Sequence, residues 1–254
     1  MKSVLDPSIP PNAGLARALT ITAREGSVLN CTHPAAVNGR IQTCQRVSDL
    51  ILGALAQAVP ERVTACSNST CTVASFIGQR PEDGSLWVYL ETMGGGNGAR
   101  ARKDGLDGVH VHTTNTSNLP VEALEIEYPL TVLRYELVCD SGGVGQYRGG
   151  MGLRRVYRAN RDCRVRVDVS RQRSRSWGLQ GGGPGAHGMV EAGPGVVFDR
   201  DTAVLKDGQW FAVVTPGAGG FGPPAERDRA AVARDLAEGT ISPATAHDTY
   251  GAVS

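Results

Sequence analysis

The chain has 254 residues, of which 41% are hydrophobic and 20% are charged, and its formal net charge is +1. This length and composition are typical of a globular protein with a substantial core, and a nearly neutral chain has no general attraction for nucleic acids or anionic membranes. No apolar run approaches the roughly 18 residues that a membrane-spanning helix needs, and no apolar signal core follows Met1. We therefore expect a cytoplasmic protein, not a nucleic-acid-binding, membrane or secreted one.

The first predicted elements are a short strand and a long helix. Alternating apolar and polar residues predict a strand over 19–22. Apolar residues then recur at helical spacing over 41–58, and Pro60 ends the pattern. We favour ordinary packing of the apolar face of this helix, which includes Cys44 and Ile51, against a sheet.

The rest of the chain is dominated by predicted strands and ends in two helices. Short apolar runs predict strands over 86–90, which would be buried, and over 211–214, and alternating patterns predict strands over 133–137 and 165–169. One C-terminal helix is predicted over 225–238 and a second over 243–251, with Ser242 as its N-cap. We predict an α+β fold: strand-dominated mixed sheets with glycine-rich loops, one long helix near the N-terminus and a C-terminal helical pair. No repeat or linker divides the chain, so residues 1–254 are expected to form one domain.

Three glycine-rich stretches lie between the predicted strands, at residues 94–98, 104–108 and 140–152. Glycine loses more conformational freedom on folding than any other residue. Such stretches therefore indicate backbone conformations barred to other residues, or the close approach of a ligand or another backbone. Residues 94–98 could present N–H groups to an anion or form a tight turn at a subunit interface. They match neither a Walker loop nor the dinucleotide fingerprint.

His110 and His112 are two positions apart, so on a strand their side chains would lie on one face. Two neutral imidazoles on one face can bind a metal ion, and Asp104 and Asp107 could add carboxylates. A metal-dependent amidohydrolase is therefore one enzyme hypothesis. Because the chain has only three other histidines and no second ligand cluster, we assign it no metal site. We favour a bond to loop backbone for His110 and leave the role of His112 open.

Polar and acidic residues follow the histidines. Asn115 and Asn118 can hold a loop by bonding to its own backbone. Glu122 and Glu125 could perform acid–base chemistry or bind a cation, or they could pair with arginines. We favour the pairing.

The stretch at residues 140–143 resembles the surroundings of the nucleophilic serine in trypsin-like enzymes. That mechanism also needs a histidine base and an orienting acid, and no upstream segment resembles the histidine motif of those enzymes. We expect instead that Asp140 and Arg148 form an ion pair that brackets the glycine stretch.

Nine arginines lie between residues 154 and 175, opposed by only Asp162 and Asp168. Recognition of RNA would call for interleaved aromatic residues, and only Tyr157 and Trp177 are near. A solvated strand face or a surface for an acidic partner is the interpretation we favour.

Taken together, many of these stretches resemble one protein family. They are residues 91–99, 104–108, 110–125 and 140–152, with further matches at 6–14, 33–37, 177–182, 216–222 and 235–251. In this order they resemble the C-terminal half of the hydantoinase B/oxoprolinase family, the non-ATPase subunit of ATP-dependent cyclic-amide hydrolases and of related ketone carboxylases. Members of that family are much longer, and their metal-binding histidines and aspartates lie in an N-terminal half that this chain lacks.

The resemblance implies a component of an ATP-dependent hydrolase, of the 5-oxoprolinase or N-methylhydantoinase type, that opens a lactam or hydantoin ring. It implies a hetero-oligomer with a hydantoinase A-like ATPase subunit, which binds ATP and magnesium. It also implies an N-terminal-half polypeptide, which holds a divalent metal. The isolated chain is then expected to be inactive. Two alternatives stay open: a non-catalytic fragment or structural subunit, and part of an acetone or acetophenone carboxylase-like complex.

The resemblance also implies which residues belong to a site, but it assigns no role to any single residue. The catalytic candidates are His112, Asn115, Asn118, Glu122, Glu125, Asp140 and Arg148. The candidates for substrate binding are Gly94, Gly95, Gly96, Asp104, Ser141, Gly142 and Gly143.

Overall fold

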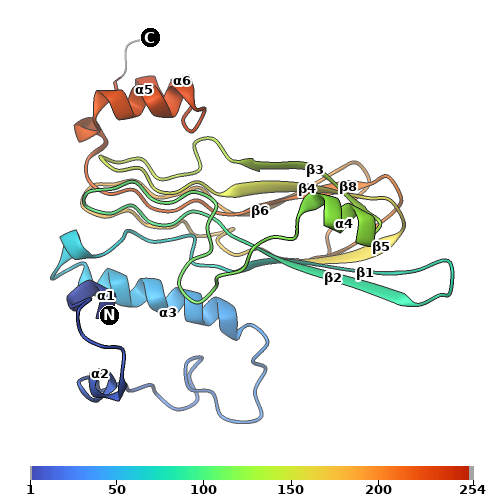
Figure 1. The fold of residues 1–254 in the computed structure, drawn as a ribbon, viewed down its shortest axis with the longest axis horizontal. Coiled ribbons are helices and arrows are strands. Elements are labelled where there is room, and N and C mark those ends of the chain that lie inside the picture. The colour runs from blue at the N-terminus through green and yellow to red at the C-terminus, as the bar shows by residue number, and fades with distance from the viewer. Residues whose placement is uncertain (1, 252–254) are drawn as a thin grey trace.

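The structure, a computed structural model that describes residues 2–251, has two sheets, an array of extended glycine-rich segments and helices near both ends of the chain (Figure 1). The helices are α1 Lys2–Leu5, α2 Ala13–Arg17, α3 Arg40–Leu55, α4 Val121–Glu127, α5 Arg229–Ala237 and α6 Pro243–Asp248, with 3-10 turns at Pro60–Arg62 and Pro224–Glu226. Within the described residues, no helix is long and apolar enough to cross a membrane. The predicted α+β class, the long helix and the C-terminal helical pair are confirmed.

Each sheet has four strands, and all the pairings are antiparallel. The sheet of order β2-β1-β5-β7 consists of β1 Thr72–Gln79, β2 Leu86–Met93, β5 Cys163–Asp168 and β7 Thr202–Leu205. The sheet of order β3-β4-β8-β6 consists of β3 Leu130–Leu137, β4 Leu153–Ala159, β6 Met189–Ala192 and β8 Trp210–Val214. The strand predicted over 19–22 is wrong: that segment is exposed and has no strand, and a short alternating segment needs a partner strand to be stable.

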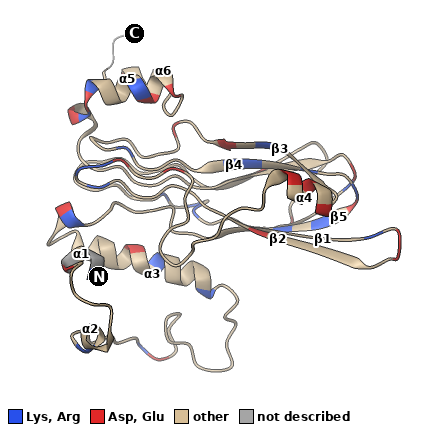
Figure 2. Ribbon diagram, in the orientation of Figure 1, with Lys and Arg blue, Asp and Glu red and all other residues tan. Residues whose placement is uncertain are grey.

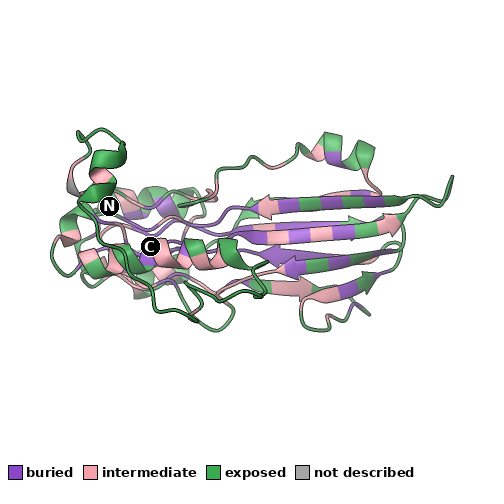
Figure 3. Ribbon diagram, turned by 90° about the horizontal axis from the view of Figure 1, so that it is seen from below, coloured by how far each residue is buried: buried purple, intermediate pink, exposed green. Residues whose placement is uncertain are grey.

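The two sheets face each other across the main hydrophobic core. In β2, Trp87 and Tyr89 are buried while Leu86 and Val88 are exposed, and Figure 3 shows the same alternation along neighbouring strands. Aromatic rings from both sheets meet in the middle. The ring centroid of Phe76 lies 5.1 Å from that of Tyr157 and 5.8 Å from that of Phe211.

Beyond the ends of the strands, the chain continues as six extended segments that we call the glycine bundle, on the left in Figure 1. They are residues 65–71, 94–99, 104–109, 141–152, 176–188 and 215–222. Segment 215–222 forms backbone hydrogen bonds with four of the others: Gly219 N to Cys66 O (2.8 Å), Ala99 N to Gly219 O (3.0 Å), Ala218 N to Gly150 O (2.9 Å) and Gly220 N to Gly183 O (3.0 Å). A β-strand pairs only along its two edges, so these segments form a bundle and not a third sheet.

Close packing of backbones explains the glycine content of the bundle. A Cβ added at Gly217 would lie 1.8 Å from the carbonyl oxygen of Ser141, and a Cβ at Gly96 would lie 2.0 Å from that of Gly150. The close approach of another backbone, one of the alternatives that the sequence left open, is therefore observed at these glycines, and Gly108 has in addition a left-handed φ of 57°. The stretches predicted as loops are packed segments.

Helix α3 covers one side of the glycine bundle, but with the face opposite to the one expected. Its fully buried residues are Gln45 and Asp49, whereas Ile41 and Ile51 of the apolar face are 44% and 40% exposed. The prediction that the apolar face packs against a sheet is wrong in this structure. The polar face turns inward because its side chains bond the backbone of the bundle; for example, Asp49 Oδ1 accepts from Ser67 N over 3.1 Å.

Candidate functional site

A cluster of polar side chains lies where α3 meets the glycine bundle. We define the His112 site by Asp49, Ser67 and His112. The Nε2 atom of His112 lies 3.1 Å from Asp49 Oδ2 and 3.0 Å from Ser67 Oγ, and Ser67 Oγ donates to Asp49 Oδ2 over 2.7 Å. Both Asp49 and Ser67 are buried, while 13% of the His112 side chain is exposed. The site therefore holds an imidazole against a buried carboxylate, with part of the ring accessible.

Strained backbone is concentrated around this site. Six non-glycine residues of the described chain have a positive φ, and three of them are here: Ser69 (59°), His112 (54°) and Arg171 (63°). Ser69 N donates to Ser67 Oγ over 2.9 Å, and Arg171 Nη2 donates to Cys66 Sγ over 2.9 Å. Such conformations cost about 1–3 kcal/mol each and cluster at functional sites. They are a second reason to regard the cluster as functional.

A turn just after the bundle sets the position of His112. Thr114 N and Thr114 Oγ1 both donate to Val111 O, and Gln45 of α3 donates to Thr114 Oγ1 over 2.9 Å. Because this segment is a turn and not a strand, the spacing of His110 and His112 does not place the two rings on one face. His110 instead lies beside Thr116, with 3.3 Å between Nε2 and Oγ1.

The electrostatics of the site favour an ionised Asp49. Burial alone would raise the pKa of Asp49, but hydrogen bonding and charge from His112, with the Ser69 and Ser67 hydroxyl groups, hold that pKa below its ordinary value. The carboxylate is therefore ionised at neutral pH and can accept a hydrogen bond from the imidazole. Burial raises the pKa of the neighbouring Cys66 thiol to about 12, so this thiol is protonated and is a poor nucleophile.

The geometry fits acid–base chemistry better than a serine nucleophile. In a Ser-His-Asp triad the two imidazole nitrogens contact different residues, but here Nε2 contacts both Ser67 and Asp49. A carboxylate accepts hydrogen bonds, so Nε2 carries the proton. Within the described chain no hydrogen bond involves Nδ1, which is left with a lone pair to act on a ligand. Among residues 2–251, no group of three or more His, Cys, Asp or Glu side chains could hold a metal ion.

The predicted asparagines lie in different surroundings. Asn115 is exposed. Asn118 donates to the carboxylate of Glu91 and to Thr92 O, over 2.9 Å in each case. Glu91 is buried between the sheets and also accepts from Arg155 and Tyr157. Asn118 therefore supports a buried polar network.

The predicted acidic pair is on the surface. Glu122 and Glu125 are exposed on α4, and Glu125 accepts from the backbone N–H of Val132 over 2.9 Å. The favoured pairing of these carboxylates with arginines is not among the contacts of the described residues.

The predicted ion pair between Asp140 and Arg148 is wrong. Asp140 has a left-handed backbone (φ 59°), and its side chain accepts from Ser242 N over 2.9 Å, which ties it to the start of α6. Arg148 instead makes two hydrogen bonds to Asp107, of 2.9 and 3.2 Å.

The predicted substrate-binding residues have partners within the chain. Asp104 binds Arg227 through two hydrogen bonds of 2.8 Å, and Ser141 Oγ accepts from Gly152 N over 3.0 Å. The glycines at 94–96, 142 and 143 are buried in the glycine bundle. Their backbone also bonds there, as Gly95 N does to Val109 O and Gly143 N to Ala218 O. Of the predicted residues, the structure brings only His112 into the His112 site.

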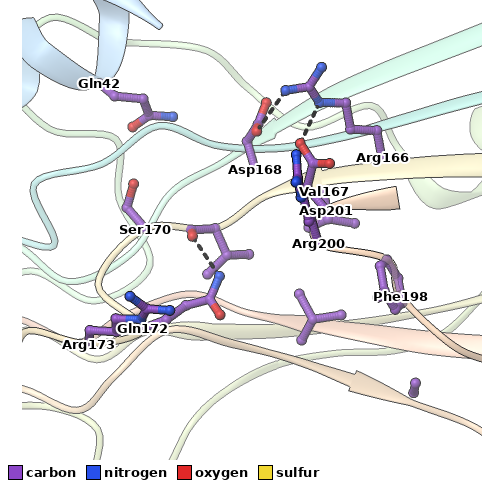
Figure 4. A pocket seen from close by; sticks show the side chains of 13 residues that line it. Gln42, Arg166, Val167, Asp168, Ser170, Gln172, Arg173, Phe198, Arg200 and Asp201 are labelled. Carbon is purple, nitrogen blue, oxygen red and sulfur yellow. Dashed lines mark hydrogen bonds and ion pairs between the residues drawn. The ribbon is translucent and has the colours of Figure 1, made fainter. Parts of the chain in front are cut away.

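A separate hollow of about 920 Å³ lies beside the end of β5 (Figure 4). Its wall includes Arg166, which pairs with Asp201 at 2.9 Å and with Asp168 at 3.5 Å, and the exposed Arg173 and Arg200. None of the predicted site residues lines it.

Of the basic stretch, Arg164 and Arg166 of β5 alternate with buried residues, as expected of a solvated strand face, whereas Arg155 of β4 is buried and donates to Glu91. Figure 2 marks the basic and acidic residues along the ribbon.

Asp49 and Ser67 were not among the predicted site residues. The sequence places Asp49 on the polar face of an amphipathic helix, a face that ordinarily meets water. Ser67 lies among other small polar residues. Only the reversed orientation of α3 shows that both belong to a site.

Known proteins show the same fold and sequence pattern. The chain matches the hydantoinase B/oxoprolinase family over residues 1–224. It is 41% identical, over 98% of its length and 44% of the relative, to the uncharacterised protein MJ0963 of Methanocaldococcus jannaschii. It is 34% identical, over 96% of its length and 42% of the relative, to the B-type subunit of a putative D-/L-hydantoinase of a Pseudomonas species.

A solved structure extends the comparison. The crystal structure of ATP-dependent caprolactamase from Pseudomonas jessenii is similar, with a TM-score of 0.81 and 26% identity, over 97% of this chain and 46% of that one. This chain spans less than half the length of these relatives. Since the family match extends over most of its length, the chain belongs to the hydantoinase B/oxoprolinase family.

Proposed function

We propose that this chain is one component of an ATP-dependent enzyme that opens the ring of a cyclic amide, of the 5-oxoprolinase or N-methylhydantoinase type. The observation that carries the proposal is the His112 site, where a buried carboxylate orients an accessible imidazole in a chain of this family. A hydantoinase A-like ATPase subunit would hold ATP and magnesium, and an N-terminal-half polypeptide would hold a divalent metal. We place this hetero-oligomer in the cytoplasm.

The chemistry assigns a specific task to His112. An unstrained lactam is a poor electrophile, so the ATPase partner would first convert the amide oxygen into a phosphorylated leaving group. His112 Nδ1 then accepts a proton from the water that attacks the activated carbon, while Asp49, 3.1 Å from Nε2, stabilises the imidazolium. The proton passes to the ring nitrogen when the carbon–nitrogen bond breaks, which leaves an acyl phosphate. A second water then hydrolyses this acyl phosphate to the carboxylate and inorganic phosphate.

Activity is expected only from the assembled complex. The chain alone should not hydrolyse 5-oxoproline or hydantoins, because it spans less than half of its relatives and would depend on a partner for activation. Addition of the ATPase subunit and the N-terminal-half polypeptide should give ring opening coupled to ADP release, measured together by chromatography. Turnover by the chain without an ATPase partner, or a complete complex that opens neither ring, would refute the proposal.

His112→Asn should lower kcat of the assembled complex about 100-fold, the typical contribution of a general acid–base. Asparagine tolerates the left-handed backbone of this position (φ 54°), so the fold should be retained. His110→Asn is the matched control and should keep kcat within about threefold, since within the described residues the His110 ring is hydrogen-bonded to Thr116 and not to the His112 site. Equal activity of the two variants would exclude His112 as the proton acceptor.

A further inference from the structure

The segment before α3 lies outside the rest of the fold. Residues 7–40 are exposed except for the half-buried Leu15 and Ser27. Hydrogen bonds of residues 7–39 reach at most seven positions along the described chain. Figure 1 shows this segment, which contains α2, looping beneath α3.

Apolar side chains of this segment and of α3 form one continuous surface, which we call the α3 surface. It contains a hollow of about 890 Å³, lined by Val28, Leu29 and Val37 of the segment and by Cys44 and Val47 of α3, among others. Val28 is 80% exposed, Leu29 57% and Val37 54%.

The exposed apolar side chains continue along α3 beyond the hollow. Leu50 is 66% exposed and Ile51 40%. An amphipathic helix normally buries its apolar stripe, and a contiguous exposed apolar patch marks an interface. The reversed orientation of α3 therefore indicates that a partner covers this side.

The lengths of the relatives identify the partner. The chain covers 44%, 42% and 46% of three of them, so more than half of each relative has no counterpart here. We propose that the α3 surface docks the N-terminal-half polypeptide of the proposed function, which corresponds to this remaining part of the hydantoinase B-type subunit. The inference rests on the partner named in the proposed function and assigns the surface that this partner contacts.

The α3 surface and the His112 site lie on opposite faces of one helix. Gln45 and Asp49 point inward to the turn and to His112, while Leu50 and Ile51 are exposed on the outer side. Docking on the outer face would therefore fix the helix that carries Asp49. The proposal thus links assembly of the subunit to the position of the carboxylate that orients His112.

Site-specific photo-crosslinking of the full chain in its native host tests the proposal. A photoreactive residue is placed at Leu29 or Leu50, and as a control at Val88, which is 59% exposed on the outer face of β2. We expect crosslinks from Leu29 and Leu50, but not from Val88, to peptides of the family region that this chain lacks. Crosslinks from the α3 surface to a second copy of this chain or to an unrelated protein, or no preference over Val88, would overturn the proposal.

A pair of variants gives an independent readout. Leu50→Glu should lower the amount of this family polypeptide that co-purifies with the chain by about tenfold, the effect expected at the centre of an interface, whereas Val88→Glu should leave it unchanged. Both side chains are exposed, so circular dichroism of the isolated variants should match that of the unaltered chain. Equal retention of the polypeptide by both variants would overturn the docking surface.

The ring-opening assay keeps the two proposals distinguishable. Crosslinks at the expected positions without cyclic-amide hydrolysis would leave the docking surface standing and refute the proposed function. Hydrolysis by a complex without those crosslinks would refute the docking surface alone.

Discussion

Replacing Arg227 with methionine is expected to lower the free energy of unfolding by about 3–5 kcal/mol, because it leaves the buried carboxylate of Asp235 and the half-buried carboxylate of Asp104 without their closest counter-charge. The side chain of Arg227 is 1% exposed. It makes two hydrogen bonds of 2.8 Å to Asp104 and bonds of 2.6 and 3.1 Å to Asp235. Because Asp104 lies in the glycine bundle and Asp235 in α5, the variant should also loosen the C-terminal helices. Urea denaturation at pH 7, followed by circular dichroism, measures the change.

Arg161→Met is the matched control. Arg161 and Glu82 lie 3.5 Å apart with side chains that are 49% and 68% exposed, and exposed pairs of this kind contribute less than about 1 kcal/mol. Similar losses in the two variants would show that the buried ion pairs do not hold the helices in place.

The same ion pair predicts how stability depends on pH. Burial alone would raise the pKa of Asp104, but the hydrogen bonds and charge of Arg227 hold it below the ordinary value of 3.8. Because the pKa of Asp104 is lower in the folded state than in the unfolded state, this carboxylate stabilises the fold fully above pH 3.8. That stability is lost as the pH falls through the pKa of the folded state. The unaltered chain should therefore lose stability from this source below pH 3.8, and Arg227→Met should lose less.

The sequence predicts elements better than it predicts which surfaces are covered. A run of apolar residues identifies β2 as a strand, although only one face of that strand is buried inside the molecule. Helical spacing likewise identifies α3, but periodicity states only which residues share a face. It cannot say that Gln45 and Asp49 lie inside and Ile51 outside, because that depends on segments far away in the chain.

The candidate site shows the same limit. The sequence indicated His112 because it lies two residues after His110. Its partners Asp49 and Ser67 are distant in sequence and belong to no recognisable motif. Asp140 and Arg148 are near in sequence, but each has a different partner: Asp140 accepts from Ser242 at the start of α6, and Arg148 donates to Asp107. Glycine content predicted close approach of some kind, but the neighbours of each segment follow only from the assembled glycine bundle.

Gly217→Ala should destabilise the fold by about 3 kcal/mol or more, at the upper end of the cost of overpacking. The added Cβ would lie 1.8 Å from the carbonyl oxygen of Ser141. This contact is with backbone, so no side chain can rotate away. The carbonyl of Ser141 is itself fixed by a hydrogen bond of 2.8 Å from Ala186 N. Relief therefore requires the segments around Gly217 to separate, with loss of their hydrogen bonds.

Gly39→Ala tests whether this effect comes from packing or from the loss of a glycine as such. Gly39 is the N-cap of α3, with an ordinary φ of −82° and no atom within 4 Å of an added Cβ. Since alanine is a poorer N-cap than glycine, replacing Gly39 should lower the free energy of unfolding by no more than about 1 kcal/mol. Thermal and urea denaturation of both variants give the comparison. A large loss confined to Gly217→Ala would mean that the bundle is stabilised by backbones in direct contact. Equal effects would mean that the bundle can open to admit a side chain, and then close packing would not explain its glycines.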